Sequence, residues 1–70
     1  MGNNSKSLNN HLKTLRAQLG LTQADLADQV KVTRKTINTV ENNVFIPSTI
    51  LALKLSEVLL VPVEEIFYLS

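Results

Sequence analysis

The stretch Val32–Asn43, VTRKTINTVENN, combines apolar side chains at helical spacing with an unusual number of neutral polar ones. Val32, Ile37 and Val40 form a narrow apolar seam, which is enough to attach a helix to a core. The other positions hold an arginine, a lysine, threonines and asparagines, and the one acid, Glu41, comes late in the stretch. An ordinary solvated helix carries Glu–Lys pairs instead. The stretch therefore predicts a helix that presents hydrogen-bonding groups to flat polar edges.

Helical signals continue upstream of this stretch. A leucine recurs every three or four residues over 8–19, which predicts a first helix. Thr22 and Asp25 have the spacing of a capping box, so a second helix begins between them. The second and third helices are predicted at about Gln23–Val30 and Arg34–Asn42.

Helical signals also continue downstream. Pro47-Ser48 is typical of a helix start, and the leucines that follow recur at helical spacing. Pro62 opens a last short helix, and no segment alternates with the period of two that a half-buried strand requires. The sequence predicts an all-α fold, a small bundle of about five helices. We expect residues 1–7 to be a flexible N-terminal tail and residues 8–70 to form one domain.

Composition restricts the chemistry that this chain can perform. Its 70 residues suffice for one small domain, and the absence of cysteine excludes disulfides, thiolate zinc sites and thiol catalysis. His11 is the only histidine, without a second imidazole or carboxylate at ligand spacing. We therefore expect no metal, no cofactor and no catalytic site. Neither a signal region nor a membrane span is visible, so the expected location is the cytoplasm.

Charge is distributed unevenly along the chain. Residues 1–40 carry six basic and two acidic side chains, whereas residues 41–70 carry one basic and four acidic. A chain with this polarity suits a polyanion on one face and a different contact on the other.

The second and third predicted helices are separated by about three residues, with only Ala27 and Val32 where they must cross. This is a helix-turn-helix arrangement, in which the second helix enters the major groove of DNA and its first residues meet base edges. Each base pair there shows a distinct donor and acceptor pattern. A helix that reads it needs one apolar seam and one polar face without carboxylates, as Val32–Asn43 provides.

The residues TQADLADQVKVTRKTINTVENNVFIPS (22–48) closely resemble the Cro/C1-type (Xre-like) helix-turn-helix transcriptional regulators of bacteria and phages. The family pattern TQ-x-x-LA, V-[ST]-x-x-x-I, EN and PS is present in this order, and LALKLSEVLLVPVEEIF (51–67) is similar to the family's last two helices. The resemblance covers about Leu8 to Phe67 and implies a lambda-repressor-like domain. It is strongest to short single-domain dimeric repressors.

The resemblance also implies roles for single residues. Gln23, at the start of the second helix, matches a phosphate contact, where an anion is favoured. Arg16 and Glu41 match a structural ion pair between the first and third helices. The base contacts that the resemblance implies are Thr33, Arg34, Lys35, Asn38 and Thr39, and the further phosphate contacts are Thr36 and Asn42.

Four positions depart from the family pattern. Lys31, Asn43 and Leu60 stand where glycines are usual, which implies either a residue with positive φ or a turn of a different shape. Val44 replaces a residue that is often basic or polar, so the resemblance does not carry one of the family's phosphate contacts over to this chain.

The apolar C-terminus exceeds what one short helix needs to dock. Exposed apolar clusters mark partner surfaces, and we expect a homodimer here. The alternative is an antitoxin-like or adaptor module whose main role is to bind a protein partner. A third possibility, an enzyme, is not supported, because the sequence shows no nucleophile–base set, metal cluster or phosphate-binding loop. The expected dimer residues are Leu53, Ile66, Phe67, Tyr68 and Leu69, with Ile50 beside them.

Overall fold

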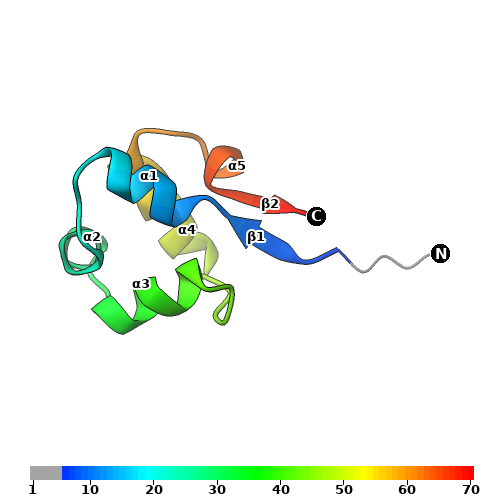
Figure 1. Ribbon diagram of the computed structural model, residues 1–70, viewed down its shortest axis with the longest axis horizontal. Helices are drawn as coiled ribbons and strands as arrows, with labels where there is room; N and C mark the ends of the chain where they lie inside the picture. Colours follow the sequence, from blue (N-terminus) through cyan, green and yellow to red (C-terminus); the bar gives the residue numbers. More distant parts are fainter. Residues whose placement is uncertain (1–5) are drawn as a thin grey trace.

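Five helices and two short strands account for most of residues 6–70, the part of the chain that the computed structural model describes. In chain order they are β1 (Leu8–Asn10), α1 (Leu12–Gln18), α2 (Gln23–Val30), α3 (Arg34–Glu41), α4 (Thr49–Leu59), α5 (Val63–Ile66) and β2 (Phe67–Leu69). Figure 1 shows α1 and α3 on two sides of the molecule with α4 between them, while β1 and β2 extend from the end opposite α2. The predicted helical fold and its helix-turn-helix are confirmed, and the small sheet is an addition.

One apolar core connects all five helices. The central side chains include Leu12 of α1, Leu26 of α2, Ile37 of α3 and Leu55 of α4, each fully buried. Removing a buried leucine side chain typically costs about 2–5 kcal/mol, so this core is the main source of stability. The ten buried apolar residues within 6–70 are Leu12, Leu26, Ala27, Val30, Ile37, Val40, Leu51, Leu55, Leu59 and Ile66.

Short-range polar signals set the helix starts as the sequence predicts. The Thr22 hydroxyl accepts from the Asp25 N–H at 3.0 Å, and the Asp25 carboxylate accepts from the Thr22 N–H at 2.9 Å. This capping box satisfies two amides that no helical carbonyl can reach. Thr33 caps the start of α3 and Ser48 caps the start of α4, each accepting a hydrogen bond from the N–H three residues later.

Three residues without glycine's freedom take a left-handed backbone conformation. Lys31 ends α2 at φ 63°, Leu60 ends α4 at φ 61°, and Asn43 follows α3 at φ 60°. The sequence allowed either positive φ or a turn of a different shape at these positions, and the structure has positive φ at all three. An L-residue in this region costs about 1–2 kcal/mol, and asparagine tolerates it best.

The two-stranded sheet is the main difference from the predicted fold. β1 pairs antiparallel with β2 in the register Leu8↔Leu69, Asn9↔Tyr68 and Asn10↔Phe67. Leu8 therefore lies in a strand, although its leucine spacing predicted a helix. Strands of three residues are too short to show an alternating pattern, and pairing of the two ends of a chain has no local signal.

The sheet extends by one residue pair beyond its assigned strands. Ser7 and Ser70 exchange two backbone hydrogen bonds, of 2.9 and 3.1 Å. Most of the predicted N-terminal tail, residues 1–5, lies outside the described residues. Within residues 6–70, no helix is long and apolar enough to cross a membrane.

Candidate nucleic-acid interface

α2 and α3 are joined by a tight turn whose backbone is fixed at each step. The left-handed Lys31 reverses the chain, and the Val32 N–H donates to the Ala27 carbonyl at 3.0 Å. Ala27 is buried under the crossing, where a larger side chain would separate the helices. The turn leaves Thr33, Arg34 and Lys35 exposed at the start of α3.

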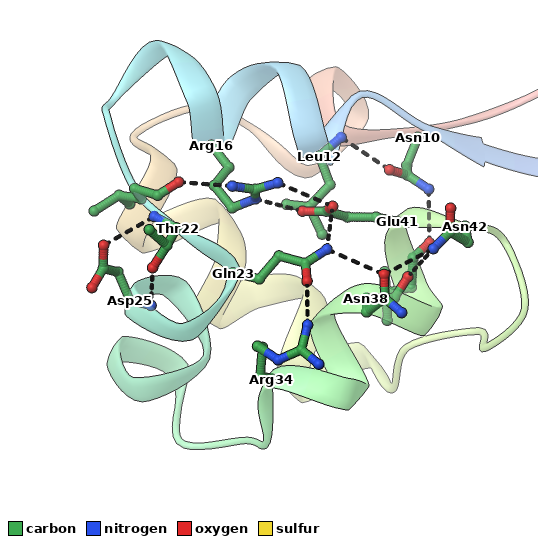
Figure 2. A network of polar contacts seen from close by, with 12 residues as sticks. Asn10, Leu12, Arg16, Thr22, Gln23, Asp25, Arg34, Asn38, Glu41 and Asn42 are labelled. Atoms are coloured by element: carbon green, nitrogen blue, oxygen red, sulfur yellow. Dashed lines mark hydrogen bonds and ion pairs between the residues drawn. The ribbon is translucent and has the colours of Figure 1, made fainter.

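The side chain of Gln23 links the first residue of α2 to both ends of α3 (Figure 2). Its Nε2 donates to Glu41 Oε1 at 3.0 Å and to Asn38 Oδ1 at 3.2 Å. Its Oε1 accepts from Arg34 Nη1 at 2.9 Å. All three partners belong to α3, so this one amide fixes the rotation of that helix against α2.

The ion pair expected between Arg16 and Glu41 forms behind this amide. Arg16 Nε donates to Glu41 Oε2 at 2.7 Å, and Nη2 donates to Oε1 at 3.3 Å. Arg16 Nη1 also donates to the Leu21 carbonyl at 2.8 Å. The side chains are 13% and 3% exposed, so both charges are neutralised inside the protein. The positive charge that remains available on α3 comes from Arg34 and Lys35.

The guanidinium of Arg34 is exposed and keeps unused hydrogen-bond donors. One of its donors is used by Gln23, and a guanidinium has five donors in a planar fork. The intramolecular bond orients the fork without using its full capacity. A bidentate contact of arginine with guanine O6 and N7 requires two of the remaining donors.

The other predicted base-contact residues are placed differently. The Thr33 hydroxyl caps α3 and lies 3.0 Å from the Thr36 hydroxyl. The Thr39 hydroxyl donates to the carbonyls of Lys35 and Thr36, both at 3.0 Å. Neither Lys35 nor Thr39 is hydrogen-bonded to Gln23, whereas Asn38 is.

The predicted phosphate contacts already have partners within the chain. The Gln23 amide is engaged as described, and Asn42 Nδ2 donates to the carbonyl and Oδ1 of Asn38 at 2.9 and 3.0 Å. The Asn42 N–H donates to the same carbonyl at 3.1 Å. A phosphate would have to replace these acceptors. At the start of α2, Thr22 already caps the Asp25 N–H, so only the amides of Gln23 and Ala24 remain suited to an anion.

Asp25 adds a negative charge at the start of α2. The hydrogen bond from the Thr22 backbone N–H, together with the one from the Thr22 side chain, holds the pKa of the Asp25 carboxyl below its usual value. The carboxylate therefore stays ionised while it caps the helix. Among residues 6–70, no three histidine or acidic side chains converge as metal ligands would.

A second surface lies at β1, β2 and the start of α4. It contains an open groove of about 540 Å³, called the apolar groove below, and Leu69, which pairs with the groove residue Leu8, is 63% exposed. Successive side chains of a strand point to opposite faces, so Tyr68 is turned away from the groove residue Phe67. The Tyr68 ring is stacked on His11, with ring centroids 4.6 Å apart, and the residue is 40% exposed. Leu53, on the groove wall, is 55% exposed. The residues lining the apolar groove are Leu8, Pro47, Ser48, Thr49, Ala52, Leu53, Val63, Glu64 and Phe67.

One of the expected dimer residues needs correction. Ile66 is fully buried in the core of its own domain and cannot meet a second copy. It lies at the end of α5, where a helical residue facing α4 is covered, and its apolar character reflects that packing. Phe67 is half-buried, and Ile50 is 68% exposed.

One further polar residue, Asn10, was not predicted from the sequence. From β1 its side chain reaches Val40 at the end of α3 and Asn43 just beyond it, 30 and 33 residues further along the chain. Local spacing cannot reveal such a contact, and only the pairing of the strands places Asn10 there.

Comparisons with known proteins identify helix-turn-helix relatives of this chain. The helix-turn-helix family profile matches residues 12–66. An uncharacterized HTH-type transcriptional regulator of Bacillus subtilis is 37% identical over 63 residues, 90% of this chain and 96% of that protein. Another, from Methanocaldococcus jannaschii, is 42% identical over 60 residues, 86% and 91% of the two chains. The crystal structure of a candidate DNA-binding protein from Bacteroides fragilis has a TM-score of 0.79 at 26% identity, covering 87% of this chain and 98% of that one.

Fold, surface and relatives define a DNA-binding regulatory module and not an enzyme. The chain belongs to the helix-turn-helix family, of Cro/C1 type. The resemblance based on its motif residues is thereby confirmed.

Proposed function

We propose that this protein is a homodimeric repressor that binds a pseudo-palindromic DNA operator and blocks a promoter by occupying it. The observation that carries the proposal is the fixed position of Arg34. Its guanidinium is exposed, yet it is held by Gln23, which is itself bonded to the buried Glu41. A cation kept in one orientation on a polar helix face is suited to recognise a specific base.

In this proposal the exposed face of α3 lies in the major groove. Arg34 binds guanine, and the flanking side chains Thr33, Lys35, Asn38 and Thr39 contact neighbouring base edges. The first amides of α2 face a phosphate. Gln23 Nε2, Thr36 and Asn42 exchange their present hydrogen-bond partners for phosphate oxygens, while Gln23 Oε1 continues to accept from Arg34.

The second copy of the chain binds at the apolar groove. Leu53 and Phe67 line the apolar groove, and the exposed residues Tyr68 and Leu69 follow Phe67 in β2. Burial of their apolar area against a partner is favourable by roughly 25 cal/mol per Å². A two-fold dimer then places two α3 helices ~34 Å apart, one turn of DNA. The operator symmetry follows from the protein symmetry. Such a regulator acts on the chromosome, in the cytoplasm of a prokaryotic cell.

A second function is favoured by one observation. The apolar groove is bordered by Glu64, and residues 41–70 are acidic overall, so this surface also suits a basic and apolar protein partner. The chain would then act as an antitoxin-like or adaptor module, with DNA binding secondary. Purification from the native host distinguishes the two: a stoichiometric protein partner supports the module, and a homodimer alone contradicts it.

The experiment that tests the first proposal is selection of bound oligonucleotides from a random double-stranded pool at physiological salt. We expect an enriched palindrome whose half-sites lie about one helical turn apart. Folded protein that enriches no sequence would contradict sequence-specific recognition, and enrichment of a single half-site would contradict the dimer.

A further inference from the structure

Asn10 bonds to three residues, in α1, in α3 and in the turn after α3, with one side chain. Its Nδ2 donates to the carbonyl of Val40, in the last turn of α3, at 2.9 Å, and to Oδ1 of Asn43 at 2.9 Å. Its Oδ1 accepts from the N–H of Leu12, the first residue of α1, at 2.9 Å. Figure 2 shows it between the start of α1 and the end of α3. Both halves of the amide are therefore in use.

The end of α3 depends on this contact for its shape. Asn43 reverses the chain at φ 60°, and its own N–H donates to Val40 at 3.1 Å. Asn10 binds both members of that turn, and Asn43 Nδ2 in addition faces Asn9 Oδ1 at 3.4 Å. Gln23 fixes α3 against α2, and Asn10 fixes its far end against β1.

β1 connects this contact to the apolar groove. Asn10 is opposite Phe67 in the sheet register, and Phe67 lines the groove. The next residue continues the pairing, because the His11 N–H donates to the Ile66 carbonyl at 2.8 Å. The apolar groove is therefore connected to α3 by the backbone pairing of β1 with β2 and by the side-chain amide of Asn10.

We propose that Asn10 is a positioning residue that couples the docking of a second copy to the placement of α3 on DNA. The inference rests on the proposed dimeric function. A partner at the apolar groove holds β2, β2 holds β1, and the Asn10 amide holds the end of α3 at one angle. The distance between the two recognition helices of a dimer is then fixed, and so is the spacing of half-sites that the dimer accepts.

The test compares Asn10→Ser with Asn9→Ser. A serine at position 10 can still accept from the Leu12 N–H in a turn, but it is too short to reach Val40 or Asn43. Asn9→Ser makes the same neutral change one residue earlier, where the amide donates to Ser7 and Ser70. It also removes the 3.4 Å contact of Asn9 Oδ1 with Asn43, but it leaves both hydrogen bonds of Asn10 to the end of α3 in place. Binding is measured on the selected operator and on operators with one base pair added or removed between the half-sites.

We expect wild-type protein and Asn9→Ser to prefer one spacing. In Asn10→Ser the preference should fall by about threefold or more, the size expected of a network residue that touches neither partner. Binding to an isolated half-site should change less than this, because the base-contacting residues are untouched. Asn43→Gly keeps the left-handed turn and removes one of the two acceptors, so it should weaken the preference in the same direction.

Each outcome decides a different claim. Unchanged spacing preference in Asn10→Ser and Asn43→Gly, with both variants folded by circular dichroism, would overturn the role of Asn10 alone. A wild-type protein that binds all spacings equally would overturn the dimeric operator and, with it, the coupling. An equal loss in Asn9→Ser would assign the effect to β1 as a whole, including the contact of Asn9 with Asn43, and would also overturn the specific role of Asn10. Should Asn10→Ser fail to fold, Asn43→Gly alone decides.

Discussion

The surface of α2 and α3 and the surface around the apolar groove differ in how many of their side chains already have a partner within the chain. On the first, Gln23, Arg34 and Asn38 each have a partner within the chain. On the second, Leu53 and Leu69 are more than half exposed. A surface whose polar groups are already ordered loses little entropy on binding, which favours selective recognition. A surface with exposed apolar side chains gains most from a partner of its own shape.

The comparison predicts that the polar surface is the more sensitive of the two to loss of a single side chain. Glu41→Ala leaves Arg16 buried without a counter-charge and deprives Gln23 of an acceptor. We expect the free energy of unfolding to fall by about 3 kcal/mol, as for other broken buried pairs. Urea denaturation followed by circular dichroism measures it. Glu57→Ala, at an exposed site on α4, is the control and should change little.

The double variant Arg16→Met/Glu41→Leu identifies the cause of that loss. Replacing both charges with apolar side chains removes the unpaired charge, and such replacements are often neutral. We therefore expect most of the stability to return. A double variant as unstable as Glu41→Ala would show that shape, and not charge, holds α1 against α3.

Arg34→Ala tests whether the prepared guanidinium reads a base. It should weaken binding to the selected operator by about 1–3 kcal/mol, and binding to random DNA much less. Fluorescence anisotropy with both DNAs at one salt concentration gives the two values. Equal losses on the two DNAs would mean that Arg34 contacts only the backbone. Arg34→Lys is informative as well, because a lysine keeps the charge and loses the bidentate geometry.

The two surfaces also differ in how far the sequence could define them. The starts of α2, α3 and α4 were predicted within a residue or so, because they depend on local signals at Thr22, Asp25, Thr33 and Ser48. The partners of Gln23 could not be predicted from local spacing, because they lie 11 to 18 residues away and depend on the crossing of two helices.

The apolar surface was harder to predict because apolar character does not distinguish core from interface. Ile66 and Leu69 have similar side chains at the same end of the chain, yet one is fully buried and the other 63% exposed. The difference arises from the sheet, which pairs Leu69 with Leu8 at the other end of the sequence. Long-range pairing of two short strands leaves no trace in local periodicity.

Leu53→Lys should disrupt the apolar surface without harming the fold. Because Leu53 is 55% exposed, we expect unfolding to change by less than about 0.5 kcal/mol. The dimer should dissociate at micromolar concentration, and affinity for the full operator should fall about tenfold, or 1.4 kcal/mol. Analytical ultracentrifugation and operator binding measure these effects. Leu19→Lys, at the exposed end of α1, introduces the same charge away from the groove and should leave both unchanged.

Leu60→Gly should produce the smallest effect and the only gain. Leu60 is 83% exposed and left-handed, so its side chain contributes little packing while its backbone is strained. Glycine removes the strain but loosens the unfolded chain, and we expect a net gain of about 0.5–1 kcal/mol in unfolding free energy. Gly20→Ala is the matched reverse: φ is 70° and a Cβ would meet nothing within 4 Å, so its loss should be purely conformational. A stabilised Leu60→Gly with unchanged operator affinity would show that strain at this turn serves neither surface, whereas weaker operator binding would make Leu60 part of the partner contact.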